Sequence, residues 1–417
     1  MGLDLTFKGR LKKKIWGKKL SCERLERILQ CLAEKFDYGF SREEEDFLVE
    51  FCPTGVLNMN LIQGKIKGHA RTSVAGPGFH KAVVDFLDVM AARLELDLLV
   101  EDDTSYWSTR DFEDLRTQHH AWLKAVTEYV SSAEQTNYLI SWPIGSWRPF
   151  NAKNVATPMG DLTFDELDKL LGLYNGIEEF AREYFIWYNP VRDALYHRGV
   201  ALYLMWNDFH WVQTRVEEEV EMASRILYHL GQARKLDSHI PLPLFAWKEV
   251  SVLSGLEGPR IEGPDFKYPF PIGYRRRDVI ISMPGEWQVR VPGSFRCDEE
   301  DDGFVYWDVD RNFRLTAYRG AGEEFVSSLT HPDMPGEESI YFEAQGLRYK
   351  AKYYLCGDHD EPEYWILRGQ ILGQDKMCIV TITWLDDKWK EWAIQTFKDV
   401  HCPKTNGTHL TMTTAQS

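Results

Sequence analysis

A glycine-rich turn is the local feature of this sequence best suited to bind a ligand. The run Ala75-Gly76-Pro77-Gly78-Phe79-His80 lies between an expected strand and an expected amphipathic helix. Backbone N–H groups and the positive end of a helix dipole at such a turn can hold a phosphate or carboxylate. The spacing fits neither the P-loop nor the dinucleotide-binding pattern, and Pro77 removes one donor. Two interpretations follow: an anion site at Gly76, Gly78 and His80, or a structural turn, which we favour.

A second candidate is a metal site on a helix. Asp193 and His197 are four residues apart and could share a face with Glu183 or His210. Helical proteins use carboxylates and histidines at this spacing as metal ligands. No second His-x-x-x-His or Glu-x-x-His pair is present, so we expect a surface ion pair and no metal or cofactor.

Aromatic residues could form a ligand cage or a hydrophobic core. His119 and His120 are adjacent, and Arg192 and Arg198 could accompany a cage. Aromatic residues at helical spacing usually belong to a core, which is the interpretation we favour. The tryptophans concerned are Trp142, Trp147, Trp187, Trp206 and Trp211.

Nucleophilic catalysis has no recognisable motif in this sequence. There is no Gly-x-Ser-x-Gly elbow, no His-Glu-x-x-His and no cysteine in a catalytic signature. The pair Asp102-Asp103 falls in an expected exposed turn, and such pairs are common in a chain of net charge −15. A site assembled in space from distant residues of 1–255 stays open as the enzyme or nucleotide-binding alternative.

Acidic residues are concentrated in the last third of the chain. Residues 285–402 hold 23 acidic and 13 basic side chains. This balance argues against general nucleic-acid binding, which needs a basic face. It could instead attract a basic protein partner, or simply form a solvated surface. The strongest acidic run, our candidate partner site, is Asp298, Glu299, Glu300, Asp301 and Asp302.

Cysteine usage and hydropathy indicate a compartment. The seven cysteines are widely spaced and form no Cys-x-x-Cys pair, which favours a reducing environment. No apolar run is long enough to span a bilayer, and the N-terminus lacks a secretory signal. We expect a cytoplasmic protein without a membrane span.

Residues 1–255 are expected to form two parts. The α+β part, 1–135, has predicted helices at 21–36, 81–94 and 111–130, and predicted strands at 47–52, 56–62, 65–74 and 96–100. The mainly helical part, 136–255, is expected to pack on the first. It opens with a capping box, Thr163 to Glu166, and has a helix predicted from 191 to about 236.

The remainder changes character. Residues 256–285 are rich in glycine and proline and are expected to form a linker. Residues 286–402 contain seven β-rich runs, a short predicted helix at 322–329 and a closing helix at 388–400. The polar tail, 403–417, is expected to be disordered. The predicted fold class is therefore multidomain α+β, with an antiparallel-sheet α/β sandwich at the C-terminus.

The C-terminal region resembles a known group. The opening run Glu286-Trp-Gln-Val-Arg-Val-Pro-Gly-Ser-Phe295, the strand Cys378-Ile-Val-Thr-Ile-Thr-Trp384 and the closing helix look like the PsbP-like and DcrB-like α/β sandwich. This resemblance implies a binding module, and the group includes chaperones of type VI secretion effectors. We expect a bacterial protein-binding protein, such as a toxin-neutralising immunity protein or an effector chaperone.

Overall fold

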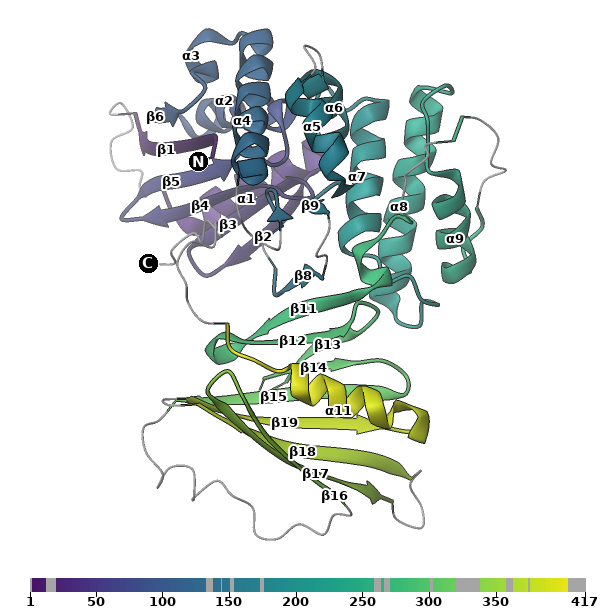
Figure 1. Ribbon diagram of the computed structural model, residues 1–417. Helices are drawn as coiled ribbons and strands as arrows, with labels where there is room; N and C mark the ends of the chain where they lie inside the picture. The colour runs from purple at the N-terminus through teal and green to yellow at the C-terminus, as the bar shows by residue number, and fades with distance from the viewer. Residues whose placement is uncertain are drawn as a thin grey trace. The chain divides into compact units, whose positions relative to one another are not determined.

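The computed structural model divides the chain into two compact units (Figure 1). It describes residues 2–12, 20–132, 138–143, 145–150, 154–172, 176–258, 264–265, 271–300, 303–319, 338–357, 363–373 and 376–403. The first unit is Met1–Pro143 with Asn151–Tyr274, and the second is Ile144–Phe150 with Arg275–Ser417. Both units combine helices with antiparallel sheets, which confirms the multidomain α+β class.

The first unit contains a six-stranded antiparallel sheet with the strand order β2-β3-β4-β5-β1-β6. Period-two alternation places Phe47 and Val49 of β3 in the core, while Leu48 faces outward. The four predicted strands are confirmed, and β1 and β2 are two further strands that the sequence did not predict. The strands are β1 (Asp4–Leu11), β2 (Gly39–Glu43), β3 (Asp46–Cys52), β4 (Gly55–Ile62), β5 (Lys65–Arg71) and β6 (Leu96–Asp102).

Helices α1 and α2 both contact this sheet. Ser21 caps α1 as predicted, because its side chain accepts a hydrogen bond from the Arg24 amide at 3.3 Å. The helix α2 begins at Pro77, four residues before the predicted start, since proline suits the first helical position. The helices of this part are α1 (Cys22–Phe36), α2 (Pro77–Leu94), α3 (Tyr106–Thr109) and α4 (Phe112–Ser132).

The rest of the first unit is mainly helical, with one small sheet of order β10-β9-β7. The predicted capping box is confirmed by Thr163 and Glu166, whose side chains each accept from the other's amide. The elements are β7 (Tyr138–Leu139), β9 (Val155–Thr157), β10 (Gly160–Leu162), α5 (Phe164–Gly172), α6 (Gly176–Tyr184), α7 (Ala194–Asn207), α8 (Glu217–Leu236) and α9 (Leu244–Ser254).

The single helix predicted from 191 to 236 is wrong, because the structure has α7 and α8 with a break between them. Trp211 lies in this break at φ 59°, in the left-handed region, where a helix cannot continue. Its indole donates a hydrogen bond to the Met205 carbonyl at 3.0 Å and so satisfies a carbonyl near the end of α7. Most residues of α7 are buried, as expected for a helix that is apolar on nearly every side.

The second unit contains two antiparallel sheets and a closing helix. The seven-stranded sheet has the order β13-β14-β15-β19-β18-β17-β16, and the smaller one the order β12-β11-β8. The seven predicted β-rich runs are all strands. Bounds are β8 (Trp147–Pro149), β11 (Asp278–Met283), β12 (Trp287–Pro292), β13 (Arg296–Glu300), β14 (Gly303–Trp307), β15 (Arg311–Arg319), β16 (Glu338–Ala344), β17 (Leu347–Cys356), β18 (Tyr364–Leu372), β19 (Lys376–Trp384) and α11 (Lys390–Asp399), with short 3-10 turns at Tyr274–Arg276, Pro284–Glu286 and Asp387–Trp389.

The helix α11 contacts both β19 and β12 and therefore joins the two sheets of the second unit. Phe397 of α11 packs over Gly369 in β18, where a Cβ atom would lie 2.2 Å from the ring. Glycine is therefore required by the close approach of this helix to the sheet. The strand β11 lies inside the segment predicted as a linker, since its Val-Ile-Ile-Ser-Met run supplies buried side chains.

Some predictions fall outside the described residues: the short helix at 322–329, Asp301 and Asp302, and the tail from 404 onward. Among the described helices, none combines the length and apolar composition needed to cross a bilayer.

Candidate functional site

The glycine-rich turn is buried against the segment that follows α6. The Gly78 amide donates to the Trp187 carbonyl at 2.9 Å, and the Trp187 amide donates to the Ala75 carbonyl at 2.9 Å. A Cβ atom on Gly78 would lie 2.1 Å from the Trp187 ring, and one on Gly76 would lie 2.6 Å from Phe185. Glycine is needed here because another segment of backbone occupies the space.

The three residues proposed as an anion site use their amides inside the protein. The Gly76 amide donates to the Thr72 carbonyl at 3.1 Å, and the His80 amide donates to the Gly76 carbonyl at 3.2 Å. Gly76, Gly78 and His80 are all buried. The geometry supports the structural turn and gives no support to an anion site.

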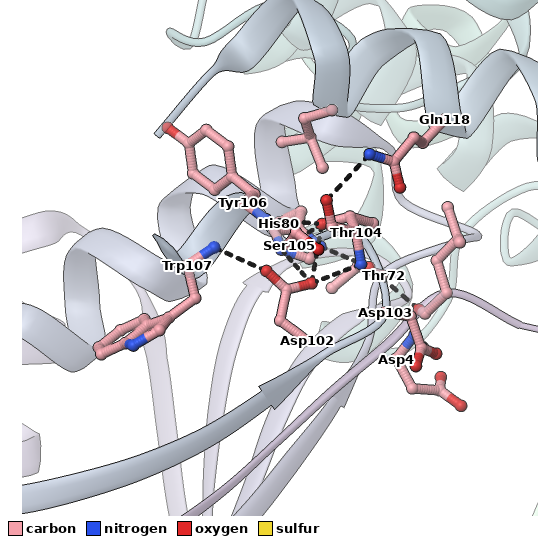
Figure 2. A network of polar contacts seen from close by, with 12 residues as sticks. Asp4, Thr72, His80, Asp102, Asp103, Thr104, Ser105, Tyr106, Trp107 and Gln118 are labelled. Carbon is pink, nitrogen blue, oxygen red and sulfur yellow. Dashed lines mark hydrogen bonds and ion pairs between the residues drawn. The ribbon is translucent and has the colours of Figure 1, made fainter. Parts of the chain in front are cut away.

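His80 is the centre of a buried polar network (Figure 2). Its Nδ1 lies 2.9 Å from the Thr72 hydroxyl, and its Nε2 lies 3.3 Å from the Thr104 hydroxyl. The Asp102 carboxylate is 3.4 Å from the same Nε2, with side-chain exposures of 0% for His80 and 3% for Asp102. The network connects the start of α2 to the end of β6 and to the turn after β5.

Asp102 accepts hydrogen bonds from the turn that leads into α3. Its Oδ1 accepts from the Thr104 hydroxyl at 2.7 Å and the Thr104 amide at 2.8 Å, and its Oδ2 accepts from the Trp107 amide at 2.7 Å. Burial alone would raise the pKa of Asp102, but the His80 hydrogen bond and charge and these further donors hold that pKa well below its usual range. The sequence interpretation of Asp102 as part of an exposed turn is wrong.

The two hydroxyl groups beside His80 constrain how its ring nitrogens hydrogen-bond. The Thr72 hydroxyl donates its only proton to the Leu3 carbonyl at 3.0 Å, and the Thr104 hydroxyl donates its proton to Asp102. Each hydroxyl can then only accept from the imidazole. All these bonds are satisfied when both ring nitrogens of His80 donate, and from this hydrogen bonding we infer a buried imidazolium–carboxylate pair.

A second buried histidine lies beside this pair. The His119 ring is 6.0 Å from the His80 ring, and His119 Nδ1 contacts the Leu115 carbonyl at 3.0 Å. Burial, and then the charge of His80, lower the pKa of His119 to about 3. His119 is therefore neutral near pH 7 and packs as a core residue.

The network does not have the geometry of a catalytic triad. In a triad the base lies between the carboxylate and the nucleophile, each on its own ring nitrogen. Here Asp102 and the Thr104 hydroxyl meet the same nitrogen, and Thr104 donates to the carboxylate. Thr104, His80 and Thr72 are each 0% exposed, so no substrate reaches them. We assign this network to the stability of the first unit.

The residues considered for a metal site are not brought together. Asp193 caps α7 by accepting from the Tyr196 amide at 3.0 Å, and Glu183 pairs with Arg198. His210 contacts Glu219 at 3.4 Å. Over the described ranges, no group of three histidine, cysteine or acidic side chains is placed to hold a metal ion.

His197 contacts a partner that local spacing could not reveal. Its Nδ1 lies 3.0 Å from Nδ1 of His229 on α8. The pKa of His229 is lowered to about 3, chiefly by burial and also by the nearby His197, Arg225 and Arg192. Burial also lowers the pKa of His197, so two neutral imidazoles sharing one proton fit this contact.

The aromatic residues mainly serve the core. Trp187, Trp206 and Trp211 are buried. Arg192 lies over the rings of Tyr38 at 4.6 Å and Trp187 at 5.3 Å, which gives it an orientation that the sequence did not supply. Arg192 also donates a hydrogen bond to the Phe51 carbonyl of β3 at 3.4 Å, so it connects the helical part of the first unit to the β-sheet.

The described part of the acidic run forms the edge strand β13. Asp298, Glu299 and Glu300 are exposed. The Asp298 carboxylate accepts from the Trp307 indole at 2.6 Å, and Glu300 pairs with Arg314. The partner-site interpretation of this run stays a prediction, and the sequence did not predict the strand, because four consecutive exposed residues show no alternation of apolar side chains.

Comparison with known proteins gives no family assignment. No family model matches the chain, and no curated protein matches it. Two solved structures each align with 30% of the chain at a TM-score of 0.24: a protein from Bacteroides thetaiotaomicron at 10% identity, and the cyanobacterial PsbP from Synechocystis at 13% identity. The alignment covers 47% of the Bacteroides chain and 91% of the PsbP chain. At this TM-score neither alignment assigns a fold or a function to the chain.

Proposed function

We propose that this protein binds another protein through β13, the acidic edge strand of its second unit. The observation that carries the proposal is the position of β13: within the described sheet it pairs only with β14. An edge strand presents unpaired backbone N–H and C=O groups that an added strand can satisfy. The partner would contribute a basic strand.

The acidic side chains provide the basis for selecting that partner. Successive residues of a strand face opposite sides, so Glu299 points away from Asp298 and Glu300. Glu299 makes no hydrogen bond or ion pair within the described residues, whereas its two neighbours are engaged by Trp307 and Arg314. A basic partner strand would gain an ion pair with Glu299 without disrupting either existing contact, and like charges would repel an acidic strand.

Toxin neutralisation and the holding of a secretion effector are the two specific roles within this proposal. Each requires a durable complex with a single protein, and a cytoplasmic location suits both. The seven cysteines, none of which is in a disulfide, motivate that location. We do not propose the enzyme or anion-binding alternative, because the amides of the glycine-rich turn are already used.

The test is affinity purification of the tagged full-length protein at low salt, with partners identified by mass spectrometry. The triple variant D298K/E299K/E300K should lose a basic partner that the wild-type protein retains. The matched control reverses Glu43, Glu44 and Glu45, three consecutive exposed acids in the β2–β3 hairpin, and should retain it. Equal capture by both variants, or no partner for the wild type, would refute the proposal.

A charged edge strand also has a protective role, which makes a different prediction. Acids on an edge discourage pairing with other copies of the chain. If β13 serves only that purpose, a variant that removes the charge, D298S/E299T/E300T, should self-associate at rising concentration, and the wild type should capture nothing. Sedimentation analysis of the two proteins separates this outcome from partner binding.

A further inference from the structure

Cys402 lies in a segment held against the second unit after α11. His401 exchanges two backbone hydrogen bonds with Gln288 of β12, at 2.8 and 2.9 Å. The next residue, Cys402, donates from its thiol to the Glu286 carbonyl at 3.4 Å. The backbone pairing of His401 and the thiol hydrogen bond position the sulfur of Cys402, which is half-buried.

Lys376, the first residue of β19, directs its amine at that sulfur. The distance from Nζ to the Cys402 Sγ is 2.5 Å. The Glu286 carboxylate is 3.6 Å from the same Nζ, and the Trp287 ring lies beneath it at 5.9 Å. The lysine side chain is 23% exposed, so small oxidants can reach the pair.

We propose that Cys402 and Lys376 form a reversible sulfur–nitrogen crosslink when a peroxide oxidises the thiol. In the first step the thiol attacks the peroxide, the O–O bond breaks, and sulfenic acid and water form. In the second step the Lys376 amine attacks the sulfur of the sulfenic acid, an S–N bond forms, and a second water leaves. Sulfenic acids condense with nitrogen in this way to give sulfenamides.

The surroundings of the pair suit both steps. The thiolate is the form of cysteine that reacts with peroxide, and the sulfur of Cys402 is accessible because the residue is only half-buried. The amine must lose a proton before it attacks, and the Glu286 carboxylate can accept it. Since Nζ already contacts Sγ, the bond requires no rearrangement of the backbone.

Four other cysteines lack this arrangement within the described residues. Cys52 and Cys378 are buried, and burial raises the pKa of both thiols. Cys31 is exposed and contacts a guanidinium, with Arg93 Nη1 at 3.5 Å, but a guanidinium is a poor nucleophile. Cys297 is exposed on β13 and serves as a second internal control.

The experiment treats the reduced full-length protein with hydrogen peroxide and digests it with trypsin without reductant. The expected product is a pair of peptides joined through Cys402 and Lys376, lighter than their sum by two hydrogen atoms. Cleavage after Lys376 should be lost, and dithiothreitol should restore it. A linked pair that retains an oxygen atom would also support a crosslink between these two residues.

Lys376→Arg is the decisive variant, because it preserves the charge and removes the nucleophilic amine. In this variant a dimedone probe should trap sulfenic acid at Cys402, while no linked peptide forms. The proposal is overturned if wild-type protein gives the same dimedone labelling as Lys376→Arg with cleavage after Lys376 intact, or if Cys402 shows no more oxidation than Cys31 and Cys297. The partner-binding proposal is unaffected by either result.

Discussion

Replacing Asp102 with asparagine tests the assignment of a buried ion pair at the start of α2. The substitution keeps the size of the side chain and removes the charge that faces His80, 3.4 Å away. It also places an amide donor where Oδ1 or Oδ2 now accepts from Thr104 and Trp107. Both side chains are almost fully buried, so water does not screen their interaction, and its removal should have its full effect on stability. Removing one member of a buried pair costs about 3–5 kcal/mol of unfolding free energy.

The assay is denaturant unfolding at pH 7. Hydrogen-exchange mass spectrometry of the peptide that spans residues 96–107 would assign the transition to the first unit. Asp103→Asn is the matched control, because the Asp103 side chain is exposed and an asparagine oxygen can still accept from the Asp4 amide, now at 3.0 Å. The control should change the unfolding free energy by less than about 0.5 kcal/mol.

The pH dependence gives a second readout. Because the pKa of Asp102 is depressed in the folded protein, its contribution is present above the unfolded value of about 3.9 and is lost as pH falls towards the folded value. The difference in stability between wild type and Asp102→Asn should therefore shrink below about pH 4.

Two results would refute the assignment of a charged pair. One is an Asp102→Asn variant as stable as the Asp103→Asn control. The other is a nitrogen NMR spectrum in which His80 carries a single ring proton at pH 7.

Three further predictions concern other parts of the chain. A histidine whose folded pKa is about 3 lowers the unfolding free energy as pH drops below its pKa in the unfolded chain, about 6.5. His119→Gln should therefore reduce the fall in stability between about pH 6.5 and 3. An unchanged pH profile of acid unfolding would contradict the neutral state of His119. Gly369→Ala should destabilise the second unit by about 1–3 kcal/mol, because the added Cβ atom would clash with Phe397. The control Gly231→Ala lies on α8, where the added Cβ atom would meet no neighbouring residue within 4 Å, and it should stabilise the protein by about 0.5–1 kcal/mol. Thermal unfolding should show a lower unfolding temperature for the first variant and a higher one for the second. Nucleotides and phosphorylated metabolites should leave the unfolding temperature unchanged, since a ligand at a hundredfold its Kd would add about 2.7 kcal/mol; a clear shift would show that the glycine-rich turn, or another site, binds an anion.

Local periodicity accounts for much of the secondary structure that the sequence predicted. The alternation in β3 and the cap at Ser21 depend on residues close together in the sequence, so they can be predicted without knowing the fold. The break after α7 is not, because it depends on Trp211 turning back to the Met205 carbonyl. A run of helix-compatible residues gave no sign of that tertiary contact.

The polar sites depend on contacts between distant residues. Asp102 looked exposed because acids surround it in the sequence, and only the placement of α2 beside β6 buries it with His80. His197 and His229 are 32 residues apart, and Lys376 and Cys402 are 26 apart. Spacing rules cover one or two helical turns, so they could not pair these residues.

The hydrogen bonds between the glycine-rich turn and Trp187 bear on how the first unit unfolds. They link residues on either side of the predicted 135/136 boundary, so neither side can open there without exposing amides that the other satisfies. The α+β part and the helical part should accordingly behave as one cooperative unit. The amide protons of Gly78 and Trp187 should exchange with solvent at a common rate. In protein truncated after residue 135, the Gly78 amide should exchange faster, because its acceptor at Trp187 is missing.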